Sequence, residues 1–390
     1  MRRRVLILTL LFAAPTPAAD LKRLPANTWV KIEYATSQPA DPLHKGSFRG
    51  AAFNKIVYDT EGKRILFYDR WVDDWHGSLL YSNCLFALDP AAGKLTPIKI
   101  ANWQKDWLRS GAVTLGYRTI PVDKEPTPCP RHVYHAFDHV PELNAVFICN
   151  GRNQSAIDTA ALEVDETMCN GAWRLDLKTN NWKAIGGPSG PPNPRPNQLG
   201  DGMAYCPDIK SLVYAGTNRQ IWILDLTKNE WRKAKHSPPP RTSMGQTIFY
   251  DAPRKRMLIL GGGRPDAWAK NKALEFRELY AFDPKTEEVT RLADGPSAFY
   301  AQHFARDTKL DVFLAVCVFS KKEEPSGIFF YDPKKDRWSE VKSENPIPPV
   351  RHRAGEAPDR MQLCFDSEHG CFIAKLYGIF WAFRLELPKK

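Results

Sequence analysis

The segment Asn180-Asn181-Trp182-Lys183-Ala184-Ile185 decides the fold, because related spellings of it return along the chain. They surround Trp231 and Trp338 inside the sequence and Trp29 near its N-terminus. A period of tens of residues is typical of a repeat architecture. The copy around Trp29 has no unit before it, and the last unit has no Trp strand after it. A closed ring explains both observations.

Each unit reads as strand, tight turn, strand, variable loop, strand, turn and closing strand. Residues 250–263 show the first hairpin of such a unit, and residues 279–289 show the second. The second hairpin turns at Asp283-Pro284-Lys285, where Pro presets φ and Asp bonds its own backbone. An equivalent turn Asp is expected in the first hairpin of all six units, at Asp59, Asp138, Asp208, Asp251, Asp307 and Asp366.

The pattern resembles the kelch-repeat β-propellers, whose blades also occur in the central domain of galactose oxidase. The turn Asp carries the resemblance, together with Gly261-Gly262-Gly263 and the closing pattern from Trp222 through Asp225 to Trp231. The double glycine survives in only one unit, and Leu95 and Val289 replace the closing Trp in two. The resemblance implies an all-β protein, a six-bladed kelch-type β-propeller closed by an N-terminal strand that completes the last blade. The blades are expected at about 49–100, 130–186, 200–236, 243–292, 298–342 and 355–387 plus 27–33, within one domain over 20–390.

The first 19 residues have the layout of a cleaved signal peptide, with arginines at 2–4, an apolar run at 5–14 and small residues near Ala18. This predicts a secreted or periplasmic protein, exported in unfolded form or through a twin-arginine route. No run is long enough for membrane insertion. The mature chain carries 11 − 3 = +8 charges, which favours either anionic partners or simply solubility. No motif for nucleic acid is present, and a monomer is expected.

Eight cysteines permit disulfides in an exported protein without requiring them. Cys364 and Cys371 flank a predicted hairpin turn and could form a bridge across it. No cysteine or histidine spacing indicates zinc, so the sequence predicts no metal and no cofactor.

The innermost strands of a propeller line its channel, and their side chains alternate between two faces. Counted from the turn Asp, the residues three positions before are mostly apolar and are expected to pack between blades. They are Ile56, His135, Tyr205, Ile248, Phe304 and Leu363. The residues four positions before are mostly polar and are expected on the channel wall. They are Lys55, Tyr134, Ala204, Thr247, His303 and Gln362.

This alignment gives the candidate site residues. The catalytic candidates, on the channel phase or just upstream of it, are His303, Tyr300, Tyr134, His132 and Arg360. Basic residues at the mouth and aromatic residues in the long loops are the ligand-binding candidates: Lys55, Trp71, Trp75, Arg131, Arg241, Trp268, His352 and Arg353. The arginines could instead brace neighbouring blades, and the aromatic residues could plug the mouth.

Three functions fit these residues. The first is a non-catalytic propeller that binds a glycan or another anionic partner, a protein included, at the mouth of the channel. The second is a sugar-directed enzyme, either a lyase of uronate polysaccharides or a sugar epimerase, that uses His, Tyr and Arg on the axis. The third is a copper radical oxidase, for which Tyr134-His135 is the one adjacent pair of the right type. The alternation of faces points these two side chains apart, so this reading is the least favoured.

Overall fold

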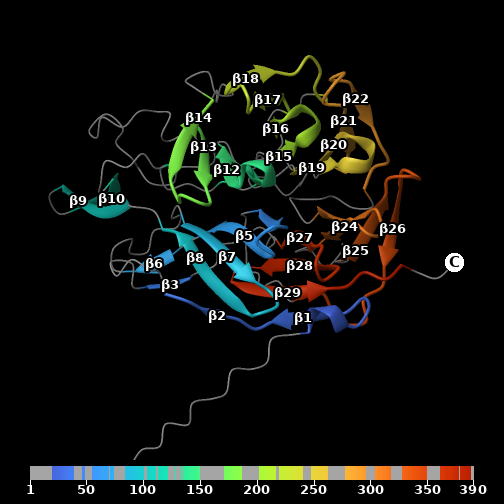
Figure 1. Cartoon of the computed structure of the whole chain (residues 1–390), viewed down its shortest axis with the longest axis horizontal. Coiled ribbons are helices and arrows are strands. Elements are labelled where there is room, and N and C mark those ends of the chain that lie inside the picture. The colour runs from blue at the N-terminus through green and yellow to red at the C-terminus, as the bar shows by residue number, and fades with distance from the viewer. Residues whose placement is uncertain are drawn as a thin grey trace, which may run out of the picture.

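The computed structural model describes residues 20–38, 46–48, 55–69, 71–73, 84–100, 103–110, 113–121, 128, 133, 135–149, 171–186, 202–216, 219–239, 247–261, 277–295, 304–317, 327–348, 361–376 and 378–387. Within these ranges, six sheets of four or five strands stand around a common axis (Figure 1). The protein is therefore all-β and a six-bladed β-propeller, as the sequence predicted.

Blades 2 to 5 take their four strands in chain order from the axis outward, whereas blades 1 and 6 each add an N-terminal strand on the outside. Blade 1 contains β4 (Ile56–Asp59), β5 (Arg64–Asp69), β7 (Cys84–Asp89) and β8 (Lys94–Lys99), with β2 (Ala35–Thr36) added parallel to β8. Blade 2 contains β11 (Phe137–Val140), β12 (Ala145–Cys149), β13 (Ala172–Asp176) and β14 (Trp182–Ile185). Blade 3 contains β15 (Gly202–Cys206), β16 (Ser211–Ala215), β17 (Ile221–Asp225) and β18 (Glu230–Lys233).

The second half of the ring repeats this plan. Blade 4 contains β19 (Thr247–Asp251), β20 (Arg256–Leu260), β21 (Leu279–Phe282) and β22 (Val289–Arg291). Blade 5 contains β23 (Phe304–Asp307), β24 (Val312–Cys317), β25 (Gly327–Asp332) and β26 (Arg337–Val341). Blade 6 contains β27 (Gln362–Asp366), β28 (Cys371–Leu376) and β29 (Ile379–Phe383), and its fourth strand is β1 (Trp29–Ile32).

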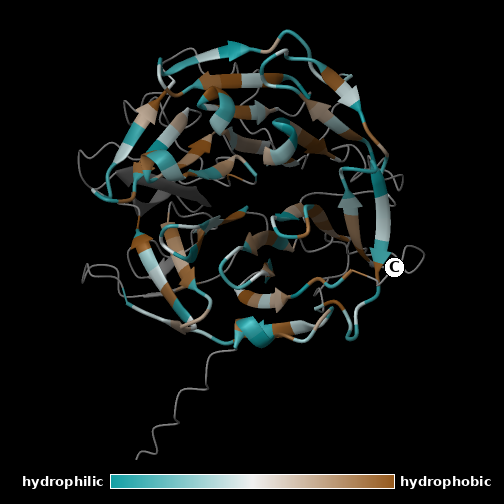
Figure 2. Ribbon diagram, turned by 45° about the vertical axis from the view of Figure 1, so that its right-hand side comes forward, coloured by the Kyte–Doolittle hydropathy of each residue, from teal (hydrophilic) through white to brown (hydrophobic). Residues whose placement is uncertain are grey.

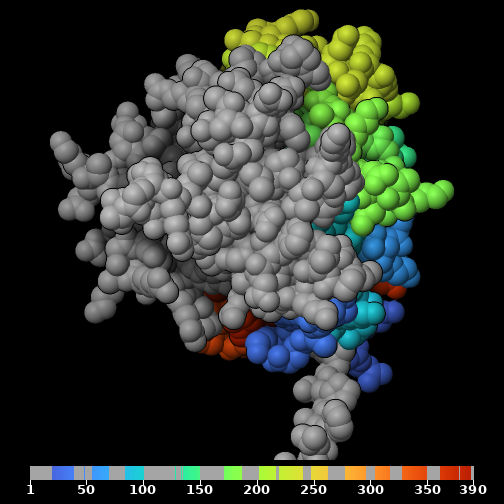
Figure 3. Space-filling model, turned by 90° about the vertical axis from the view of Figure 1, so that its left-hand side faces the viewer, coloured from blue at the N-terminus to red at the C-terminus, as the bar shows by residue number. Residues whose placement is uncertain are grey.

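The N-terminal strand β1 closes the ring. It pairs antiparallel with β29, with Trp29 opposite Phe383 and their ring centroids 4.6 Å apart. Asn345, which follows blade 5, accepts a hydrogen bond from the Trp29 backbone N at 2.8 Å and donates one to its O at 2.9 Å. Figure 3 shows the N-terminal residues in blue beside the last strands in red. The predicted closure of the last blade is confirmed.

The residues that close the six blades occupy one equivalent position. Each lies directly opposite a large apolar residue of the third strand, so that a side-chain pair covers the outer part of the blade. The pairs are Leu88–Leu95, Leu175–Trp182, Leu224–Trp231, Phe282–Val289, Tyr331–Trp338 and Phe383–Trp29. Leu95 and Val289 therefore fill the position that Trp fills elsewhere.

The alignment of the turn Asp was wrong in two blades. Asp138 lies inside β11, two residues before the turn, and Asp208 lies two residues after the equivalent position, in the 3₁₀ helix η4 (Pro207–Ile209). Val140 and Cys206 stand where Asp59 stands in blade 1. Pro141 and Pro207 follow them directly and preset φ, so these turns form without an Asp.

A left-handed residue at the fourth position of each first-hairpin turn fixes this corrected register. The six residues are Lys63, Asn144, Lys210, Lys255, Asp311 and Gly370, with φ between 41° and 66°. Two more turns of this kind contain the 3₁₀ helices η3 (Pro141–Leu143) and η5 (Ala252–Arg254). Because the correction is two residues, it leaves the alternation of side chains between faces unchanged.

The hydrophobic core is divided among the interfaces between blades. The described residues form six buried clusters, one for each pair of neighbouring blades. The cluster between blades 6 and 1 joins Phe380 and Ile373 to Phe67 and Ile56, so the seam of the ring is packed like the other interfaces. Figure 2 shows hydrophobic residues gathered in the inner strands and hydrophilic residues in the turns and outer strands.

Smaller elements lie beside the ring. β3 (Gly46–Phe48) pairs with β6 (Trp71–Asp73), and β9 (Trp103–Ser110) pairs with β10 (Val113–Pro121) in a hairpin outside the blades (Figure 1). The 3₁₀ helix η1 (Leu21–Arg23) precedes β1. No helix in the described ranges is long and apolar enough to cross a membrane.

Cys364 and Cys371 are free, buried thiols. In the ladder Cys364 lies opposite Ile373 and Cys371 lies opposite Asp366, so the two cysteines are diagonal neighbours rather than a facing pair. The bridge that the sequence suggested between them is not formed.

Candidate functional site at the channel

The two ends of the ring differ in the connections that they carry. We call the end where the innermost strands β4, β11, β15, β19, β23 and β27 begin the start end, and the end where these strands turn into the second strands the turn end. The connections at the turn end are short. Those at the start end join different blades, or second strands to third strands, and many of their residues lie outside the described ranges.

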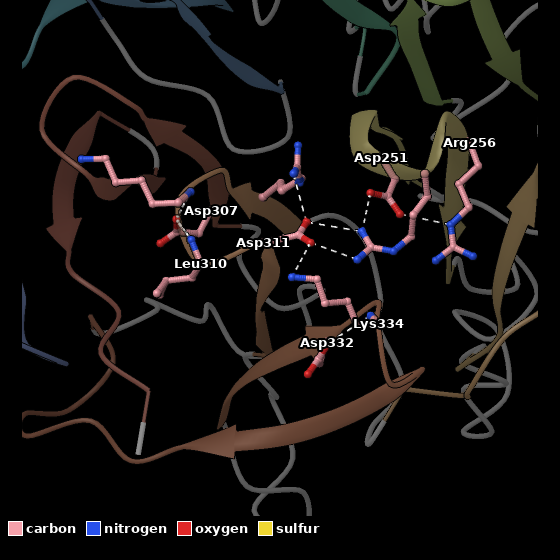
Figure 4. A network of polar contacts seen from close by, with 10 residues as sticks. Asp251, Arg256, Asp307, Leu310, Asp311, Asp332 and Lys334 are labelled. Carbon is pink, nitrogen blue, oxygen red and sulfur yellow. Dashed lines mark hydrogen bonds and ion pairs between the residues drawn. The ribbon is translucent and has the colours of Figure 1, made fainter. Parts of the chain in front are cut away.

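At the turn end, ion pairs join neighbouring blades. Arg254 of blade 4 donates to Asp251 of its own turn at 3.0 Å and to Asp311 of blade 5 at 2.9 Å (Figure 4). Arg306 and Lys334 approach the same Asp311 at 3.0 and 3.3 Å. Hydrogen bonds from these groups, with that of Arg254 the largest contribution, hold the pKa of Asp311 well below its usual range. The charged side chains of these turns therefore hold blades 4 and 5 together.

At the start end, a lysine reaches the axis of the ring. Lys55 directly precedes β4 of blade 1, and its Nζ donates to Asp138 Oδ1 of blade 2 at 3.1 Å and to the Met203 carbonyl of blade 3 at 2.9 Å. The same atom lies 5.6 Å from the centroid of the Phe249 ring of blade 4. An atom from blade 1 that contacts three further blades in succession must lie near the axis. Only 7% of Lys55 is exposed.

The partner of Lys55 is held in turn. The Asp138 Oδ2 atom accepts a hydrogen bond from the Tyr205 backbone N at 2.6 Å, so the two carboxylate oxygens have different donors. The side chain of Asp138 is 16% exposed. Asp138 could occupy this place only because it precedes the turn by two residues. Because of these two residues between Asp138 and the turn, the sequence alignment wrongly took Asp138 for the turn residue. The same spacing could have identified Asp138 as a channel residue.

Two further ion pairs are buried near the start end. Lys375 of β28 lies 2.5 Å from Asp69, the last residue of β5, and joins blade 6 to blade 1. Arg219, which follows β16, lies 2.6 Å from Glu278, which precedes β21, and joins blade 3 to blade 4. Apolar residues of similar volume would serve stability as well as buried ion pairs do.

Among the described residues with a buried polar atom that has no hydrogen-bond partner, two are the first residue of an innermost strand. They are Thr247, at its Oγ1, and Gln362, at its Nε2, and each residue is 1% exposed. Both stand four positions before the turn residue of their blade, as Lys55 does. An unsatisfied buried polar group costs about 1–3 kcal/mol, and native proteins supply it with water or a ligand.

The described ranges cover few of the candidate site residues. Lys55 contacts blades 2 and 3 through its Nζ, and Trp71 lies in β6 opposite Phe48. His135 is buried, with 1% exposed, as its position predicted. The remaining candidates lie outside the described ranges: His303, Tyr300, Tyr134, His132, Arg360, Trp75, Arg131, Arg241, Trp268, His352 and Arg353. Within those ranges, no group of three His, Cys, Asp or Glu residues could hold a metal ion.

Fold and closure define the class, a six-bladed β-propeller. No protein-family model matches the chain, and no curated protein sequence matches it. Among solved structures 1097 chains match, including one described as a novel fungal alcohol oxidase with catalytic diversity among the AA5 family, in complex with copper. That match has a TM-score of 0.49 and 10% sequence identity, and covers 85% of this chain and 62% of the oxidase chain.

Proposed function

We propose that this protein is an exported β-propeller that binds a glycan at the start end of its channel. One observation carries the proposal: the Nζ of Lys55, which comes from blade 1, lies at the axis among groups of blades 2, 3 and 4. A charged group held there occupies the place where ligands of a ring-shaped scaffold meet all blades at once.

Two features of the start end support this choice. At the start end, Thr247 and Gln362 keep polar atoms without a described partner. Binding groups are commonly supplied by long connections on a rigid scaffold, and the long connections of this chain join strands at the start end.

The composition of those connections points to a sugar. The sequence places Trp71, Trp75 and Trp268 after second strands, together with carboxylates and amides. Sugars stack their CH groups on aromatic rings, while their hydroxyl groups bond polar side chains. The first 19 residues have the layout of a signal peptide, which supports export to the periplasm or to the outside of the cell, where polysaccharides are met.

Retention on immobilised glycans tests the proposal. The mature protein is passed over a panel of neutral, uronate-containing and sulfated polysaccharides, beside a double variant Lys55→Met with Asp138→Asn. The double change removes the ion pair without leaving an uncompensated buried charge. Lys178→Met is the matched control, because Lys178 is an exposed lysine in the turn between β13 and β14.

We expect the wild type and Lys178→Met to be retained by at least one glycan and the double variant to elute early while keeping its melting temperature within a few degrees. If the wild type passes the whole panel unretained, glycan binding is the wrong function. If the double variant is retained as well as the wild type, the ligand does not bind at the axis.

A further inference from the structure

We propose that the innermost polar groups of the start end recognise an uncharged, hydroxyl-bearing sugar unit and discriminate against a carboxylate or sulfate in the same place. The groups concerned are Lys55, Asp138, Thr247 and Gln362, which we call the axial floor. This inference rests on the proposed glycan binding and names the chemical class of ligand that the site accepts.

The described cations at the axial floor and beside it are paired with carboxylates. The Nζ atom of Lys55 is 3.1 Å from a carboxylate oxygen of Asp138. Lys375, another cation at this end, is paired at 2.5 Å with Asp69. Each of these two described cations thus has its own negative charge, and the charges of the two pairs sum to zero. An incoming carboxylate would be placed beside the carboxylate of Asp138, and like charges at such short range oppose binding.

Lys55 and Asp138 can form more hydrogen bonds than those to their described partners. The Lys55 ammonium has three donors, and two of them are directed to Asp138 and to the Met203 carbonyl. The Asp138 carboxylate accepts from Lys55 and from the Tyr205 backbone N, which leaves lone pairs on both of its oxygens. Counting partners among the described residues, the pair keeps one further donor and further acceptors side by side. A hydroxyl group, which donates one bond and accepts others, matches this set.

Thr247 and Gln362, which have a polar atom without a described partner, stand near Lys55 in the order of the strands. Thr247 precedes Phe249 by two residues in β19, so both side chains lie on one face of the strand, and the Phe249 ring faces Lys55 Nζ. Gln362 begins β27 in the blade next to Lys55, directly opposite Lys375 of the 2.5 Å ion pair. Both groups are 1% exposed and stand, like Lys55, four residues before the turn Asp of their blade. A neutral hydroxyl and an amide NH₂ are suited to the hydroxyl groups of a sugar.

Matched ligands test the inference. Oligosaccharides of galacturonate, glucuronate and mannuronate are each compared with the carboxyl-reduced form of the same oligosaccharide, in which a CH₂OH group replaces the carboxylate. Calorimetric titration of the mature protein gives the ratio of the two dissociation constants. We expect the reduced form of at least one pair to bind about tenfold tighter or more than its uronate. Equal or tighter binding of the uronates overturns the inference, although glycan binding would still stand.

Variants locate the discrimination. Thr247→Val and Gln362→Met each remove one polar group with little change of volume, and we expect each to weaken binding of the reduced oligosaccharide by about five- to tenfold. Thr290→Val, an exposed threonine in β22 of the same blade as Thr247, is the control and should bind as the wild type does. Asp138→Asn should bring the dissociation constants of the reduced and the uronate form closer together.

The outcomes separate the two proposals. If Thr247→Val and Gln362→Met keep their melting temperatures and bind the reduced form as tightly as the wild type, these groups hold only water and the inference fails. Glycan binding would then still stand. If none of the matched oligosaccharides binds and no polysaccharide of the panel retains the protein, the proposed function itself fails.

Discussion

Removal of the N-terminal strand should open the ring. Trp29 and Ile32 of β1 are 3% and 1% exposed, and each packs into a cluster that blade 6 shares with a neighbouring blade. Loss of a buried Trp costs about 3–5 kcal/mol and loss of a buried Ile about 2–5 kcal/mol, so deletion of residues 20–34 should cost about 5–10 kcal/mol. With an unfolding entropy of about 2.1 cal/mol/K per residue over roughly 370 residues, this lowers the melting temperature by roughly 6–13 °C.

Scanning calorimetry of the truncated and mature proteins measures this shift. A synthetic peptide of residues 20–36, added to the truncated protein, should raise the melting temperature again, because the open edge of β29 and the side chain of Asn345 remain available to it. The same peptide with Trp29→Ala should restore little, since the contact with Phe383 is lost. An unchanged melting temperature after the deletion would refute closure by β1.

Three further predictions follow from described contacts. Asp311 has a lowered pKa when folded, so it stabilises the protein above about pH 4 and loses this effect as the pH falls towards the lowered pKa; thermal melts of Asp311→Asn should lie below wild type at pH 7, and this difference should begin to shrink only below about pH 4 and shrink further as the pH falls. Burial raises the pKa of Cys206 to about 11 and that of Cys371 to about 12; mass spectrometry should therefore find both unmodified by iodoacetamide at pH 8 until denaturant is added, and rapid native labelling would contradict their burial. A Cβ on Gly186, where φ is +80°, would lie 2.3 Å from the Trp231 ring nitrogen; Gly186→Ala should lower stability by about 1–3 kcal/mol in urea unfolding, and an unchanged midpoint would contradict this close packing.

The sequence predicted the fold well because the repeat marks the closing strand of each blade. Trp29 could be assigned to the last blade from its spelling alone, and the ladder opposite Phe383 confirms that assignment. Leu95 and Val289 were recognised as substitutes for Trp, since the rest of their units follows the same order. The sequence pattern of the closing strand recurs because every blade packs its two faces against neighbouring blades in the same way.

The turn assignment failed where the chemistry of the turn changed. An Asp was expected at the same position in all blades, but Pro141 and Pro207 set two of the turns by fixing φ, which frees the preceding position for Val140 and Cys206. Asp138 and Asp208 are near enough to these turns to imitate the missing residue. Spacing alone could not distinguish a turn Asp from one that faces the channel.

The candidate site could be predicted only in part. The alternation of side chains placed Lys55, Thr247 and Gln362 on the channel phase. Their partners could not be predicted, because Asp138 and the Met203 carbonyl belong to other blades and approach Lys55 only when the ring is closed. The buried pair of Lys375 and Asp69 joins the last blade to the first, over 300 residues apart in sequence, and no local pattern signals it.

A ligand bound at the axis beside Lys55 is the central prediction for the channel. A crystal structure of the protein with a retained oligosaccharide tests it most directly. We predict a sugar hydroxyl group within hydrogen-bonding distance of Lys55 Nζ or of the Asp138 carboxylate, with the turn end unoccupied. A sugar bound at the turn end, or on the outer strands with the axis filled only by water, would contradict the prediction.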